Sequence, residues 1–192
     1  MTRILLPLVA LLLAGCGIND VPEKRNTVDA SWAQVQNQYQ RRADLIPNLV
    51  RTVEGYANQE REVLREVTEA RSRASSIQLS ADDLNDPAKV AQFEAAQEQL
   101  SGALSRLLVT VERYPDLKSN QNFLALQSQL EGTENRIAVA RQDYIRTVQD
   151  YNREFMVLPD RWVASIFNGE YEKAAVFEAP PAAQEAPEVS FE

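Results

Sequence analysis

The stretch Arg41-Arg42-Ala43-Asp44-Leu45-Ile46-Pro47-Asn48-Leu49-Val50 decides the fold of this chain. It lies inside the longest apolar stripe of the sequence, and it carries a proline where a long helix must bend or start again. The proline ring clashes with the carbonyl group four residues earlier, and proline has no N–H to donate. The stretch therefore predicts a helical protein whose first long helix is kinked or broken at Pro47.

The stripe around this stretch steps by four and three residues without interruption, which is typical of a seam between packed helices. Its positions are Val28, Trp32, Val35, Tyr39, Arg42, Ile46, Leu49, Val53, Tyr56, Glu60, Val63, Val67, Ala70, Ala74 and Ile77. Pro47 leaves two alternatives. The helix either continues through a kink, or it stops near Ala43 and restarts with Asp44 as N-cap. We favour two helical segments, folded or sharply bent at Pro47. One kinked helix would be about 75 Å long at 1.5 Å per residue, which is longer than the helices expected to pack against it.

Two further stripes predict the partner helices. Asp86-Pro87 should cap the first of them, and Pro115 should end it. Leu158-Pro159-Asp160 should stop the second, after which Asp160 can cap a short helix through Phe167. The stripe positions are Val90, Phe93, Gln97, Leu100, Leu104, Leu107, Val111 and Tyr114, then Phe123, Leu126, Leu130, Thr133, Ile137, Ala140, Tyr144, Val148, Tyr151 and Phe155. The sequence predicts an all-α antiparallel bundle of about four long helices.

Composition limits the classes of function. The 192 residues suffice for one hydrophobic core, and the net charge of −8 argues against binding to nucleic acid. The chain has no histidine, which excludes Ser-His-Asp triads, HExxH zinc sites and Glu-x-x-His di-iron sites. Glu60 and Gln97 fall on apolar stripes, where we expect them to snorkel outward or to set the helix register. We predict no catalytic residue, no metal site and no cofactor.

The N-terminal segment resembles the signal of a bacterial lipoprotein. Arg3 precedes an apolar run from Ile4 to Leu13 that is shorter than the ~20 residues of a membrane span. The run ends in Leu13-Ala14-Gly15-Cys16, which is similar to the lipobox of bacterial lipoproteins. In a lipobox the cysteine thiol is modified with diacylglycerol, and a palmitate-type acyl chain completes the lipid anchor. The alternatives are an ordinary signal peptide and an uncleaved anchor. By resemblance to the sorting of enterobacterial lipoproteins, Gly17 in place of aspartate implies the periplasmic face of the outer membrane in a Gram-negative host. In a host without an outer membrane, we expect the outer face of the cell membrane.

These patterns divide the chain into four parts. We predict a signal peptide at residues 1–15, a tether at 16–27 that begins with acylated Cys16, and a helical bundle at 28–170. Residues 171–192 form an acidic tail of proline, alanine and glutamate. We expect this tail to be disordered, because it cannot bury enough apolar surface to offset its ordering entropy.

Four segments of the bundle carry a family resemblance. They are residues 41–50 with Gly55-Tyr56-Ala57; Tyr114-Pro115-Asp116-Leu117-Lys118 with Asn120, Asn122 and Phe123; residues 126–137; and Ala140-Arg141 with Tyr151-Asn152. Together they resemble the LemA family of bacterial envelope proteins. The resemblance implies a bundle of about four helices on the outer side of the membrane, and it brings no catalytic site. Family members usually begin with an uncleaved transmembrane helix, and their ending differs from Phe167-Asn168-Gly169-Glu170-Tyr171.

Two polar groups are candidate sites for a protein partner. The first, at the predicted bend, consists of Arg41, Arg42, Asp44 and Asn48. Its alternative is structural, with Asp44 as a cap and the arginines paired with carboxylates of a neighbouring helix. The second, at one tip of the bundle, consists of Tyr114, Asp116, Lys118 and Asn120. Its alternative is a tight connection whose polar groups satisfy free helix ends.

The function that fits these features best is a lipid-anchored scaffold or adaptor without catalysis, which binds an unidentified envelope protein near the membrane. One alternative is an envelope enzyme or enzyme accessory that acts on cell wall or protein. Another is a metal- or ligand-binding bundle. Exposed seam residues such as Tyr39 or Arg42 would also permit a homo-oligomer.

Overall fold

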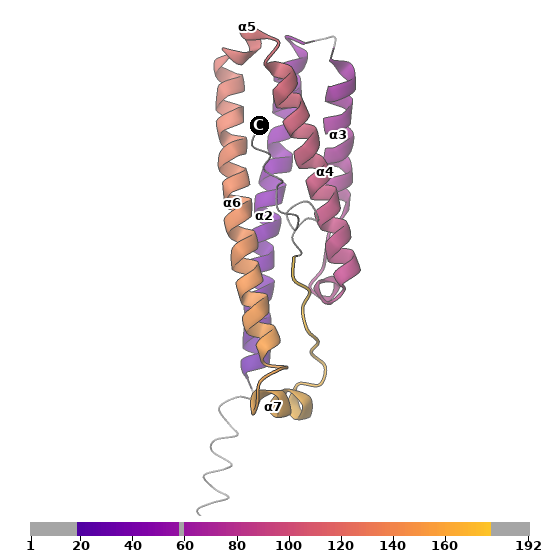
Figure 1. Ribbon diagram of the computed structural model, residues 1–192, viewed down its shortest axis with the longest axis vertical. Helices are drawn as coiled ribbons and strands as arrows, with labels where there is room; N and C mark the ends of the chain where they lie inside the picture. Colours follow the sequence, from indigo (N-terminus) through magenta and orange to yellow (C-terminus); the bar gives the residue numbers. More distant parts are fainter. Residues whose placement is uncertain (1–18, 58–59, 178–192) are drawn as a thin grey trace, which may run out of the picture.

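The computed structural model describes residues 19–57 and 60–177, and within them every regular element is a helix. The four long helices of this part are α2 (Asp20–Glu54), α3 (Arg61–Ser76), α4 (Pro87–Val111) and α6 (Gln121–Arg153). The short elements are the 3₁₀ helix η1 (Asp82–Asn85), α5 (Pro115–Lys118) and α7 (Asp160–Phe167). The long helices run alternately up and down one bundle (Figure 1). The predicted all-α antiparallel bundle is confirmed.

Pro47 does not end the first helix. α2 is continuous for 35 residues with Pro47 inside it, and the chain turns only after Gly55. The predicted break, with Asp44 as N-cap, is therefore wrong. Pro47 cannot donate to the carbonyl of Ala43, but Arg71 of α3 donates its Nε–H to that oxygen at 2.8 Å. A side chain of a neighbouring helix thus satisfies the carbonyl group that the proline leaves without its usual donor.

The bundle also begins earlier than predicted. Residues 20–27, expected to form part of a tether, are the first turns of α2, and Val21 and Arg25 are buried there. Pro22 lies in the first turn, where its missing N–H has no intrahelical acceptor to satisfy. Residues 1–18 lie outside the described residues, and with them lie the predicted signal peptide and Cys16.

Asparagine and aspartate caps start two of the long helices. Asp86 accepts hydrogen bonds from the backbone N–H groups of Ala88 and Lys89, as predicted. α6 begins only after Asn120, whose side chain accepts from two backbone N–H groups of its first turn. Asp160 is the first residue of α7 rather than its cap, because Pro159 occupies the N-cap position.

The core consists of two apolar clusters along the bundle axis. The upper cluster lies among all four long helices and is mainly aliphatic; it contains Ile46, Leu49, Val53, Ala57, Leu64, Val67, Ala70, Ala74, Leu100, Ala103, Leu104, Leu107, Val111, Leu117, Phe123 and Leu130. The lower cluster is rich in aromatic rings; it contains Val21, Val28, Trp32, Val35, Tyr39, Leu79, Leu84, Val90, Phe93, Ile137, Ala140, Tyr144, Val148, Tyr151, Ala164, Ala174, Ala175 and Phe177. We call the surrounding parts of the bundle the upper half and the lower half.

A C-terminal segment completes the lower half. α3 and α4 are shorter than α2 and α6, and residues 171–177 run back from α7 alongside the longer pair (Figure 1). We call these residues the strap. The Asn152 side chain donates to the carbonyl of Ala174 at 2.8 Å and accepts from its N–H at 2.9 Å. Tyr151 donates to Glu172 at 2.7 Å, and Ala175 donates to the carbonyl of Leu84 at 2.7 Å.

Phe177 anchors the end of the strap. It is only 6% exposed and lies 5.0 Å from Tyr144 and 5.9 Å from Trp32 between ring centroids. The predicted disordered tail at 171–192 is therefore wrong for residues 171–177, which belong to the folded core. Residues 178–192 lie outside the described residues.

Candidate functional site

Two connections between helices meet at the upper end of the bundle (Figure 1). Asn120, before α6, donates its side-chain N–H to the hydroxyl of Tyr56 in the turn after α2 at 2.8 Å. Tyr114, before α5, donates its hydroxyl to the carboxylate of Glu60 at 2.9 Å. Arg113 donates to the same oxygen of Glu60 at 3.0 Å. These contacts join residues far apart in the sequence into one polar tip.

The four predicted loop residues lie together at this tip, but they do not share one role. Tyr114 and Asn120 hold the two connections together, and the hydrogen bond to Glu60 raises the pKa of Tyr114, which keeps its hydroxyl protonated. Asp116 and Lys118 are exposed, and Lys118 pairs with Glu112. The fully buried Leu117 between them fixes the loop to the core. Asp116 and Lys118 are therefore the two members whose side chains are exposed at the surface of the tip.

The structure separates the other predicted group. Arg41, Asp44 and Asn48 are exposed on α2, where Asp44 accepts from Gln40 at 2.7 Å and Asn48 accepts from Arg51 at 2.5 Å. Arg42 points into the bundle and is 1% exposed. Only the first three residues can contact a partner from the surface.

Arg42 joins helices at the boundary between the two clusters. Its guanidinium donates to Glu134 of α6 at 2.8 Å, to Ser101 of α4 at 2.8 Å and to the side chain of Gln97 at 2.6 Å. Gln97 in turn donates to the carbonyl of Ala74 of α3 at 3.3 Å. The network thus connects all four long helices. This is the structural alternative for Arg42, in which the arginine pairs with a carboxylate of a neighbouring helix.

Two expectations about seam residues need correction. Tyr39 and Arg42 are buried, so they are not exposed seam positions that could serve self-association. Glu60 is not on a helical seam, because it precedes the first residue of α3 and binds Tyr114 and Arg113 at the tip. Gln97 is a buried polar contact between helices, as its position on an apolar stripe indicated.

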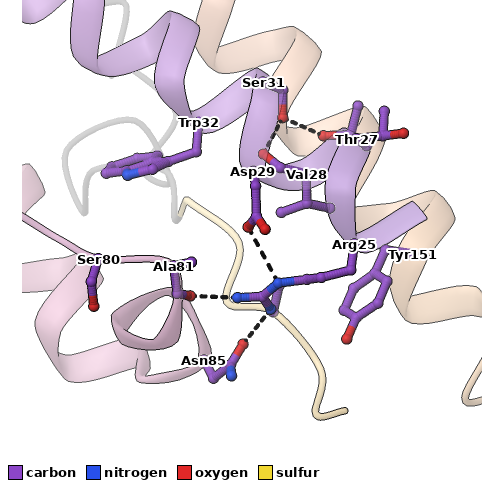
Figure 2. A network of polar contacts seen from close by, with 12 residues as sticks. Arg25, Thr27, Val28, Asp29, Ser31, Trp32, Ser80, Ala81, Asn85 and Tyr151 are labelled. Atoms are coloured by element: carbon purple, nitrogen blue, oxygen red, sulfur yellow. Dashed lines mark hydrogen bonds and ion pairs between the residues drawn. The ribbon is translucent and has the colours of Figure 1, made fainter. Parts of the chain in front are cut away.

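A second arginine network, which the sequence reasoning missed, lies in the lower half. Figure 2 shows Arg25 between the first turns of α2 and the loop that contains η1. Its guanidinium donates to the side chain of Asn85 at 2.7 Å and to the carbonyl of Ala81, and it forms an ion pair with Asp29 at 3.2 Å. Arg25 lies three residues before Val28, the first position of the predicted seam. Extending that seam toward the N-terminus by one step of three residues would have placed Arg25 among the buried positions.

In the described part of the chain, no three or more histidine, cysteine, aspartate or glutamate side chains are grouped so that they could hold a metal ion. Among those same residues, no helix is both long and apolar enough to cross a membrane. The exposed polar residues of the tip lie on short connections between long helices.

Comparisons with known proteins agree with this architecture. A family model described as the LemA family matches residues 31–191. Protein LemA of Metamycoplasma hominis is 23% identical over 134 residues, which are 70% of this chain and 57% of that protein. Magnetosome proteins MamQ 2 and MamQ 1 of Paramagnetospirillum magneticum are each 34% identical over 80 residues, which are 42% of this chain and 29% of each relative. The chain thus spans little more than half of the first relative and under a third of the others.

Proposed function

The chain belongs to the LemA family, and on that premise we propose that it is a lipid-anchored scaffold or adaptor that presents the tip of its bundle to a protein partner. Membership of this family points to a membrane-associated protein of the bacterial envelope. LemA family proteins are not known enzymes, and the proposed role requires no catalysis.

The N-terminal sequence supports the lipid anchor. The apolar run from Ile4 to Leu13 leads directly into Gly15 and Cys16, and Cys16 is the only cysteine of the chain. Acylation of this thiol would supply the two lipid signals that make membrane attachment stable. Gly17 favours the outer membrane in a Gram-negative host.

The length and continuity of α2 support the scaffold role most directly. α2 begins at the lower end of the bundle, and the polar tip lies at the opposite end (Figure 1). α2 joins them as one helix of 35 residues, which at 1.5 Å per residue spans about 50 Å. A protein held by its N-terminus would therefore present Asp116 and Lys118 far from the lipid surface.

The chemistry of the tip indicates what kind of partner it fits. Asp116 and Lys118 offer opposite charges on a loop fixed by Leu117, and Tyr56 adds a half-exposed ring with a hydroxyl group. Charged side chains around an aromatic residue suit a polar protein surface with complementary charges. Such a surface would give specificity and a transient complex rather than a permanent apolar interface.

The test is site-specific photo-crosslinking in the membranes of the native host. A photoreactive residue replaces Lys118 at the tip in one variant and Val139, which is 59% exposed on α6, in the control. We expect one defined envelope protein to crosslink from position 118 and not from position 139. Equal crosslinking from both positions, or none from position 118, would contradict binding at the tip.

The anchor is tested separately by mass spectrometry of the mature protein. We expect a diacylglycerol-modified Cys16 at the N-terminus, and we expect Cys16→Ala to leave the membrane fraction. An unmodified Cys16 with residues 1–15 still attached would contradict the lipid anchor.

A further inference from the structure

The lower end of the bundle exposes a patch of large apolar side chains, which we call the end patch. It is formed by the turn after α6 and by α7, and its members are Met156, Val157, Leu158, Trp162, Ile166 and Phe167. These are six of the eleven large apolar residues that are exposed in the described part of the chain. Scattered exposed apolar residues are normal, but a contiguous patch marks an interaction surface.

α7 is oriented so that it cannot bury this patch by itself. The helix lies crosswise at the end of the bundle (Figure 1), and it packs against the lower cluster through Ala164, which is 2% exposed. Trp162 and Ile166 are one helical turn apart on the outward face, and they are 63% and 72% exposed. α7 is thus an amphipathic helix whose apolar face points away from the protein.

The length of chain between Cys16 and the start of α2 indicates what covers this face. α2 begins at Asp20, at the same end of the bundle as α7 (Figure 1). Cys16 lies four residues before Asp20, and four residues reach at most about 14 Å even when fully extended. A lipid on Cys16 would therefore hold the end patch within a short distance of the membrane surface.

We propose that α7 and the turn before it form a second membrane contact, with the end patch inserted into the interface of the lipid layer that holds Cys16. This proposal rests on the lipid anchor of the proposed function. Trp162 and Phe167 are the residue types that amphipathic interfacial helices bury among lipid headgroups.

The charges beside the end patch indicate that apolar burial drives this contact. Arg153 and Arg161 are exposed beside the patch, but Asp160, Glu170 and Glu172 lie nearby and offset them. The contact should therefore form on zwitterionic lipid without anionic headgroups. A single anchor leaves the bundle free to tilt, whereas two contacts at one end would hold its axis away from the surface.

The test compares two matched positions in the full-length acylated protein. Ile166 of α7 and Val109 of α4 are both 72% exposed, so Ile166→Cys and Val109→Cys change comparable surface positions. Because acylation blocks Cys16, each variant has one free thiol for an environment-sensitive fluorophore. The labelled proteins are inserted into preformed phosphatidylcholine vesicles, and quenching by aqueous iodide and by spin-labelled lipid is measured.

We expect the label at position 166 to be quenched by the spin-labelled lipid and to be several-fold less accessible to iodide than the label at position 109. A matched pair that lacks residues 1–16, and therefore the lipid, should give the two labels equal access to iodide in buffer without vesicles. Circular dichroism should show that both variants keep the helical fold.

Three outcomes would overturn the proposal. The first is equal access of iodide to both labels in vesicles. The second is protection of position 166 that rises with protein concentration and yields crosslinks between two copies, which indicates self-association. The third is protection that appears only in native membranes together with a crosslinked protein, which indicates a protein partner.

Mass spectrometry of the same samples separates this inference from the proposed function. An acylated Cys16 with a water-accessible position 166 removes only the second membrane contact. An unmodified Cys16 removes both the anchor and the reach on which the contact depends.

Discussion

The upper and lower halves of the bundle bury their apolar clusters with different elements. In the upper half, four helices surround a mainly aliphatic cluster, and their backbone groups are satisfied within the helices. In the lower half, α2, α6 and the first turns of α4 surround an aromatic cluster together with η1, α7 and the strap. The strap is extended, so its backbone groups need partners from elsewhere, and Asn152, Tyr144 and Tyr151 supply them. Because α3 and α4 are shorter than α2 and α6, the strap covers part of the lower core, and polar side chains must supply the hydrogen bonds that its backbone needs.

Arg42 lies where the halves meet, and its replacement should have the largest effect. Arg42→Ala removes the donor that Gln97, Ser101 and Glu134 share and leaves a cavity beside Tyr39. We expect a loss of about 3–5 kcal/mol in the free energy of unfolding, because the substitution creates a cavity and leaves the buried side-chain oxygen of Gln97 without its donor. Urea unfolding measures it, and the exposed Arg41→Ala is the control, with a change within about 0.5 kcal/mol. Equal effects of both substitutions would contradict the joining role of Arg42.

Phe177→Ala tests whether the strap belongs to the lower core. The substitution empties the space between Trp32 and Tyr144, and we expect a loss of about 3 kcal/mol. Hydrogen exchange should show lost protection at residues 171–177 and at η1, while α3 and α4 near the tip stay protected. Val176→Ala, at a partly exposed neighbour, should change little. Uniform loss of protection along the bundle would contradict separate halves.

High pH should weaken the lower half, through two buried tyrosines, more than the tip, where the pKa of the less buried Tyr114 is also raised. Burial raises the pKa values of Tyr144 and Tyr151 above the usual value of about 10, so the folded state keeps these protons longer than the unfolded state. Stability is therefore fully present below about pH 10 and falls as the pH rises towards the folded-state values. Unfolding measured from pH 8 to 12, with tyrosinate absorbance, should show this decline. Tyr144→Phe should flatten it, and an unchanged slope would count against Tyr144.

The helix caps should give the smallest effects and should not distinguish the halves. Asp86 and Asn120 each accept hydrogen bonds from two backbone N–H groups, at the starts of α4 and α6. Asp86→Ala and Asn120→Ala should each cost about 1 kcal/mol. Asn120→Ala also removes the bond to Tyr56, so Tyr56→Phe serves as its control. A much larger loss for Asn120 alone would mean that the tip network stabilises the upper half.

Local patterns predicted the parts of the fold that depend on local chemistry. The seam spacing indicated the helical bundle, Asp86-Pro87 indicated the start of α4, and Gln97 was correctly placed among apolar positions. The tip residues were also brought together as a loop. In each case the deciding interaction lies within a few residues of the chain or repeats along one helix.

The errors concern interactions between distant residues. The continuity of α2 through Pro47 depends on Arg71, which donates from another helix. The seam position of Arg42 and its pairing with a neighbouring carboxylate were among the expectations, but its burial was not, because its acceptors come from α4 and α6. The strap looked like a disordered tail because alanine and glutamate carry little apolar signal. Its order depends on Asn152 and on the ring of Phe177, which no local pattern reveals.

The strap also determines the order in which the two halves can fold. The upper cluster draws on residues between Ile46 and Leu130, so it can close as soon as that part of the chain has emerged. The lower cluster contains both Val21 and Phe177, so almost the whole chain must emerge before it is complete. Contacts of such large sequence separation form slowly. The protein should therefore acquire its tip first and close its N-terminal end last.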